Sequence, residues 1–161
     1  MKRLTTLLLT GITVLGMAIA GLPLPGFAQS DQFLGMWQLN LAKSKYSPGP
    51  APRSETTNNQ AEGQGIKITL TGTNGNGNPI NVVATRVFDG IAHPVMNPNW
   101  DAAAWTRIDA STLIVSRTKA GKLVGTVTLA VSPDGRTMTI TEIGVDANGR
   151  STNDLAVYDK Q

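Results

Sequence analysis

The sequence FLGMWQLNL at residues 33–41 decides the fold class of this chain. Trp37, Leu39 and Leu41 alternate in it with polar residues, which is the period-two pattern of a β-strand with one buried and one wet face. We therefore predict that this stretch is the first strand and that Trp37 anchors the core. The alternating runs that follow must pack their apolar faces against it.

Residues 1–28 have the pattern of a secretory signal peptide. The basic residues Lys2 and Arg3 precede an almost uncharged apolar run, which ends in small residues suited to a signal peptidase. Cleavage after Ala28 leaves residues 29–161 as a single β-barrel domain, long enough for one core. The alternative is a retained membrane anchor, because the apolar run approaches the roughly 20 residues that a membrane span needs.

Charge and composition exclude several classes of function. Loss of Lys2 and Arg3 lowers the formal charge from +3 to +1, and no basic cluster remains to bind nucleic acid. The chain has no cysteine, which excludes disulfides, thiolate metal sites, thiol nucleophiles and a lipid-modified cysteine. We expect an exported protein, periplasmic or extracellular, with no membrane anchor after cleavage of the signal.

Alternating runs separated by turn residues continue through the middle of the chain. We expect strands over residues 54–62, 66–71 and 80–88, the first of them as a weak or edge strand. Asp89 and Gly90 follow directly, and an Asp-Gly pair between two apolar residues predicts a two-residue hairpin, since both positions favour positive φ.

Two segments interrupt this pattern. Residues 47–53 contain three prolines, which predicts an extended surface connection rather than a helix. Residues 93–104 form a long irregular stretch, in which residues 101–104 could make one helical turn. Long loops in compact domains are usually functional or mobile, so this stretch is the first place to search for a site.

The last third of the chain is the most regular. Gly121, Gly135 and Gly149 stand in turn sequences at a spacing of 14 residues, which predicts a meander of strands about ten residues long. No helical period occurs after residue 28. We therefore predict an all-β, antiparallel up-and-down meander that closes into an eight- to ten-stranded barrel.

Three charged residues are in phase with the apolar faces of their strands, namely Arg86, Arg117 and Glu142. If those registers persist, the three side chains point inward and create a polar, hydrated patch able to hold an acidic group. The alternative is that the strands bulge or end, so that the charges reach solvent. Ile143 and Val145 switch phase after Glu142, which favours a bulge there.

Trp100 and Trp105 bracket the end of the irregular stretch, where aromatic side chains can cover a barrel mouth or contact a ligand. Together with Arg86 and Arg117, they are our candidate ligand-binding residues. His93 is the only histidine, and no Gly-x-Ser-x-Gly motif occurs. The sequence therefore predicts no catalytic residue, no metal site and no cofactor.

The two ends of the domain carry a family resemblance. Gly35-x-Trp37 on the first strand and the closing sequence VYDK at residues 157–160 resemble the lipocalin and fatty-acid-binding-protein superfamily, including small exported bacterial lipocalin-like proteins. Fatty-acid-binding proteins carry a carboxylate-binding Arg two residues before the closing Tyr, where this chain has Ala156. They also place two lid helices after the first strand, where this chain has the prolines of residues 47–53.

The resemblance implies a binding function. We expect an exported non-catalytic protein that binds a small, partly apolar ligand, which the inward arginines could make an anionic one. The alternative is a structural or protein-interaction β-module with a packed interior and no ligand. A cavity favours the first hypothesis, and a filled interior favours the second. The sequence indicates no oligomeric state.

We predict that the exported protein begins at Gln29, because signal peptidase should cut after Ala28. Intact-mass spectrometry of material from the source compartment should give the mass of residues 29–161. A mass that retains residues 1–28 would instead support the membrane anchor.

Overall fold

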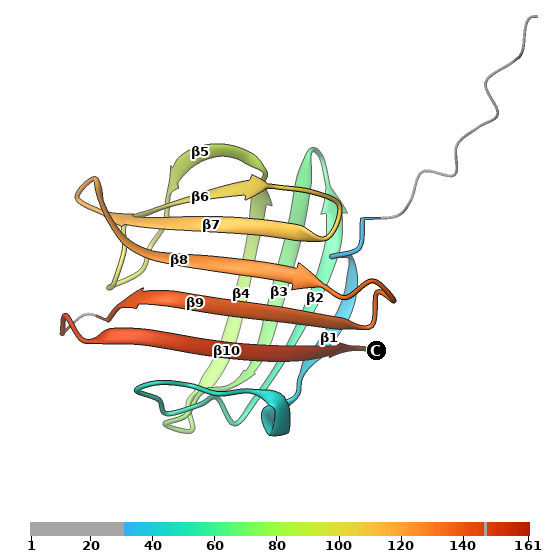
Figure 1. Cartoon of the computed structure of the whole chain (residues 1–161), viewed down its shortest axis with the longest axis horizontal. Helices are drawn as coiled ribbons and strands as arrows, with labels where there is room; N and C mark the ends of the chain where they lie inside the picture. The colour runs from blue at the N-terminus through green and yellow to red at the C-terminus, as the bar shows by residue number, and fades with distance from the viewer. Residues whose placement is uncertain (1–30, 147) are drawn as a thin grey trace, which may run out of the picture.

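The computed structural model describes residues 31–146 and 148–161, and this part of the chain forms a β-barrel (Figure 1). Residues 1–28, which we interpret as a signal peptide, lie outside it. In the described residues there are ten strands and one short 3-10 turn, η1 (Leu41–Lys43). The strands are β1 (Gly35–Leu39), β2 (Ser54–Glu62), β3 (Gly65–Thr73), β4 (Pro79–Val87), β5 (Asp89–Pro94), β6 (Ala102–Arg107), β7 (Thr112–Lys119), β8 (Lys122–Val131), β9 (Thr137–Val145) and β10 (Ser151–Lys160).

All neighbouring strands pair antiparallel in one sheet, in the order β4-β3-β2-β1-β10-β9-β8-β7-β6-β5. Figure 1 shows strands β6 to β10 crossing in front of β1 to β4, so that the sheet curls around an interior. Strands β4 and β5 end the sheet and share no ladder in the described structure, although they are consecutive in sequence. The predicted all-β meander is confirmed, and its barrel is nearly closed, with a gap between β4 and β5.

Two predictions about the first strands are wrong. Strand β1 ends at Leu39, because the Asn40 side chain accepts a hydrogen bond from the Lys43 backbone N–H and turns the chain into η1. Leu41 is therefore exposed instead of continuing the strand. Strand β2 is not an edge strand, since it pairs with β3 along its whole length and with β1 over residues 56–59. Two of its polar residues, Thr57 and Asn59, are buried on its inner face.

The hairpin predicted at Asp89 and Gly90 is wrong. The chain passes directly from β4 into β5, and Asp89 pairs with Thr106 of β6 rather than with β4. The positive φ of Gly90, +72°, serves a β-bulge between Asp89 and Ala92. An Asp-Gly pair meets the conformational demand of such a bulge as readily as that of a hairpin turn.

The irregular segment is shorter than the sequence predicts. Strand β5 runs to Pro94 and β6 begins at Ala102, so only residues 95–101 lack a ladder. The helical turn considered for residues 101–104 is wrong, because three of those residues belong to β6. The proline-rich connection at residues 47–53 contains no helix or strand and is mostly exposed, as predicted. No helix in the described part of the chain is long and apolar enough to cross a membrane.

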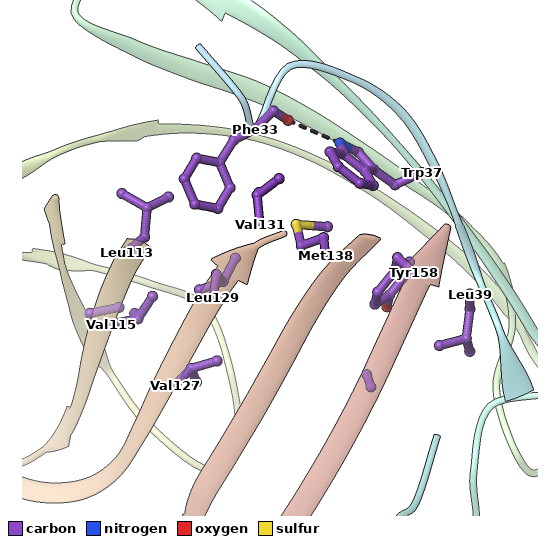
Figure 2. Close-up of a cluster of buried hydrophobic side chains, with 12 residues drawn as sticks. Phe33, Trp37, Leu39, Leu113, Val115, Val127, Leu129, Val131, Met138 and Tyr158 are labelled. Carbon is purple, nitrogen blue, oxygen red and sulfur yellow. Dashed lines mark hydrogen bonds between the residues drawn. The ribbon is translucent and has the colours of Figure 1, made fainter. Parts of the chain in front are cut away.

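The core lies at one end of the barrel, beneath the segment that leads into β1 (Figure 2). Phe33 and Trp37 are fully buried there. The Trp37 indole Nε1 donates to the Phe33 carbonyl at 3.1 Å, and the Asn59 amide donates to the same oxygen at 2.9 Å. The buried cluster comprises Phe33, Trp37, Leu39, Ala103, Leu113, Val115, Val127, Leu129, Val131, Met138, Ala156 and Tyr158.

Replacing Trp37 tests this core. Trp37→Ala should cost about 3–5 kcal/mol of unfolding free energy, as deletion of a buried aromatic side chain typically does. Met36→Ala is the matched control, because Met36 is its neighbour on β1 and is 46% exposed. Urea denaturation should show a large fall in midpoint for Trp37→Ala and little change for Met36→Ala. Equal midpoints for the two variants would mean that Trp37 does not hold the core.

Candidate ligand-binding site

The core does not fill the barrel, and a cavity of about 240 Å³ remains beside it. We call this space the interior cavity. Its wall is mostly apolar and includes a few polar and charged side chains. It is lined by Thr57, Asn59, Ile68, Leu70, Trp105, Val115, Arg117, Val127, Leu129, Met138, Ile140, Glu142 and Tyr158.

Two further hollows lie at the β4–β5 gap. The gap hollow, about 430 Å³, is bounded by β4, residues 94–97 and 100, β6 and β7. The outer hollow, about 240 Å³, lies between β4 and β5 and includes His93. Trp105 lines all three spaces, and Arg117 lines both the interior cavity and the gap hollow. The interior cavity therefore adjoins the gap hollow, and the two share Trp105, Val115 and Arg117 as wall residues.

The structure brings together the four residues that the sequence singles out. Arg86, Trp100, Trp105 and Arg117 all line the gap hollow. The Arg117 guanidinium carbon lies 4.0 Å from the centre of the Trp100 ring, and that of Arg86 lies 6.0 Å from the centre of the Trp105 ring. Each arginine is thus placed against an aromatic face, an arrangement that favours a cation.

The two arginines differ in their polar partners. Arg117 forms an ion pair with Glu142 from β9, and both side chains are largely shielded, at 18% and 30% exposure. Arg86 has one hydrogen bond, from Nη1 to the Thr85 carbonyl at 3.3 Å, and no carboxylate lies within ion-pair distance of it among the described residues. Burial lowers the pKa of Arg86, because it removes water from a cation that no nearby carboxylate stabilises.

The bulge predicted at Glu142 is wrong. The ladders of β9 with β8 and β10 continue through Glu142 without a shift, and the residue lines the interior cavity. Ile143 and Val145, which suggested the bulge, face outward and are 60% and 42% exposed. The apolar residues therefore change phase without any interruption of the strand, because Ile143 and Val145 are exposed apolar side chains on its outer face. A bulge does occur next to Arg117, but it lies on the neighbouring strand β8, where Val124 is the extra residue between the partners of Arg117 and Thr118.

A polar cluster that the sequence did not indicate lies on the inner side of β2. Tyr158 donates from its hydroxyl to Glu55 Oε2 at 2.5 Å. Burial raises the pKa of Glu55, and the hydrogen bond from Tyr158 opposes that rise. Burial and the charges of Glu55 and Asp154 raise the pKa of Tyr46 to about 12. The sequence does carry a signal for this cluster, because Glu55 has the same period-two phase on β2 as the buried Thr57 and Asn59.

His93 is paired rather than free. Its Nε2 lies 2.8 Å from Asp89 Oδ2, across the bulge of β5. The pKa of Asp89 is lowered chiefly by the Ile91 N–H, and then by His93. Within residues 31–146 and 148–161, no three metal-ligating side chains come together.

Comparison with known proteins supports the architecture. No protein-family model matches the chain, and no curated protein matches it. Among solved structures it is similar to the zebrafish ileal bile acid-binding protein complexed with cholic acid, with a TM-score of 0.53 and 13% identity. The match covers 81% of this chain and 99% of the zebrafish chain. At this identity the similarity shows the fold, an antiparallel β-barrel, and not a shared ligand.

The raised pKa of Glu55 predicts a pH dependence of stability. At pH values below the ordinary pKa of a glutamate, Glu55 is protonated in both the folded and the unfolded chain. Its burial then does not lower the free energy of unfolding. As the pH rises through that value, the unfolded chain ionises first, so the folded state loses stability until its own pKa is passed. Glu55→Gln removes this loss.

Urea denaturation between mildly acidic and neutral pH should therefore show Glu55→Gln gaining stability relative to the parent as the pH rises. Tyr158→Phe should steepen the decline of the parent, because it removes the hydrogen bond that stabilises the carboxylate. A stability difference between Glu55→Gln and the parent that is constant with pH would show that Glu55 is hydrated in the folded chain.

Proposed function

We propose that this protein is an exported, non-catalytic binding protein that holds a small, partly apolar molecule inside its barrel. The observation that carries the proposal is the interior cavity, which adjoins the gap hollow and shares wall residues with it. A structural module with a packed interior would have filled this space. The signal-like sequence of residues 1–28 supports export to the periplasm or the medium.

The cavity wall favours an amphipathic ligand. Aliphatic side chains from β3, β7, β8 and β9 form its apolar part, and Thr57, Asn59 and Tyr158 contribute polar atoms. Ligand sites commonly combine such a wall with a few polar groups that fix orientation, in volumes of about 300–1,000 Å³. The interior cavity alone is smaller than that range, so the ligand is small or extends into the gap hollow.

The charge of the site favours an acidic group on that ligand. Among the side chains that line the three hollows of the described structure, Arg86 and Arg117 are cationic and Glu142 is the single carboxylate. The hollows therefore carry an excess of one positive charge. A carboxylate can make charge-assisted hydrogen bonds to a guanidinium, which fix its head while the barrel wall buries its body. The zebrafish protein of similar fold is complexed with cholic acid, which supports this class of ligand.

A substitution that fills the interior cavity tests the proposal. Ile140→Phe adds bulk to the wall of the cavity and should weaken binding of both decanoate and 1-decanol by about tenfold or more, equal to about 1.4 kcal/mol. Ile143→Phe is the matched control, because Ile143 lies on the outer face of the same strand. Isothermal titration calorimetry measures both, after urea denaturation has shown that both variants are folded.

Equal affinities for Ile140→Phe and Ile143→Phe would place the bound amphiphile outside the interior cavity. Failure of the parent protein to bind either amphiphile would favour the packed structural or protein-interaction module.

A further inference from the structure

The two arginines of the site have different roles in the structure. Arg117 is already engaged on both sides, by the carboxylate of Glu142 and by the face of Trp100 at 4.0 Å. A ligand carboxylate could reach it only in competition with Glu142, which repels a second negative charge. Arg117 and Glu142 together contribute no net charge to the interior cavity, and their pairing explains how both can lie in the wall.

Arg86 has the capacity that Arg117 lacks. A guanidinium carries five N–H donors, and the contact to the Thr85 carbonyl uses one of them at the long distance of 3.3 Å. The side chain is half-buried at the gap, lines both the gap hollow and the outer hollow, and lies over Trp105. No carboxylate in the described residues pairs with it. Its donors are therefore available to an anion that arrives from solvent.

We propose that Arg86 is an anion-binding subsite at the β4–β5 gap, which holds the acidic head of an amphipathic ligand while the apolar tail extends over Trp105 into the interior cavity. The inference rests on the proposed function and adds the orientation of the ligand and the residue that selects it. The fit is chemical: a carboxylate can accept two parallel bonds from a guanidinium, and the gap is where no ladder between strands obstructs the approach.

The route for the tail follows from shared lining residues. Trp105 borders all three hollows, so an alkyl tail that runs from Arg86 along this ring passes from the gap to the interior cavity. Val115, which lines both the gap hollow and the interior cavity, continues the apolar path. A ligand bound this way buries its apolar part and keeps its charge near solvent, which avoids the large cost of burying an unpaired carboxylate.

The test compares decanoate with 1-decanol, which share a chain length and differ in charge. The readout is the ratio of their affinities, measured by isothermal titration calorimetry. The parent should prefer decanoate. Arg86→Gln should reduce this ratio by about tenfold to a hundredfold, the range expected for loss of a charged hydrogen-bond partner.

The double variant Arg117→Gln/Glu142→Gln is the matched control. It removes both members of the internal ion pair and leaves the net charge of the hollows unchanged. The ratio of the decanoate and 1-decanol affinities should therefore stay at the parent value, even if both affinities change by the same factor. If the ratio falls in this double variant but is unchanged in Arg86→Gln, the acidic head binds at Arg117 and the inference is wrong.

Ala84→Glu provides a second variant that does not delete Arg86. Ala84 lies two residues before Arg86 on the same face of β4, about 7 Å away along the strand, so a carboxylate there should pair with Arg86 and lower the ratio in the same way. An unchanged ratio in a folded Ala84→Glu protein would contradict the subsite. If the parent binds both amphiphiles equally, interior binding stands and the Arg86 subsite falls. If it binds neither, the proposed function falls with it.

Discussion

The Phe33 carbonyl is the point on which the arrangement of this barrel depends. It accepts hydrogen bonds from Trp37 and Asn59, which come from β1 and β2, and so fixes the segment before β1 over one end of the barrel. The Phe33 ring then packs among the largest buried side chains, and Arg107 lies over it at 5.5 Å. Because the core is concentrated at this end, the rest of the interior is left to a cavity.

Charge placement inside the barrel follows a consistent physical rule. The Arg117–Glu142 pair is shielded but mutually neutralising, and the half-buried carboxyl of Glu55 has a raised pKa and a hydroxyl partner in Tyr158. Each group is paired or altered in the way that burial demands. Arg86 is the contrasting case among the described residues, since it has neither a carboxylate partner nor full hydration. This contrast is the basis for assigning the anion subsite to it.

The sequence predicted correctly the strands and turns that depend on a local period. The predictions that depend on which strands pair with each other were wrong. The alternation around Trp37 and the glycine spacing of 14 residues are local signals, and both correspond to observed strands and turns. Whether Asp89 and Gly90 make a hairpin or a bulge depends on whether β5 pairs with β4 or β6, which no local pattern encodes. The same limit applies to the site: the period allowed Arg117 to face either inward or toward solvent, and only the fold shows that it lines the cavity and is neutralised by Glu142.

The most direct test of the account is a crystal structure of the protein with 10-bromodecanoate, located by the anomalous scattering of its bromine. The account predicts the bromine among the aliphatic side chains of the interior cavity, near Val127 and Ile140, and the carboxylate at Arg86 in the β4–β5 gap. A bromine on the outer surface, or an interior cavity that remains without ligand at saturating concentration, would contradict it.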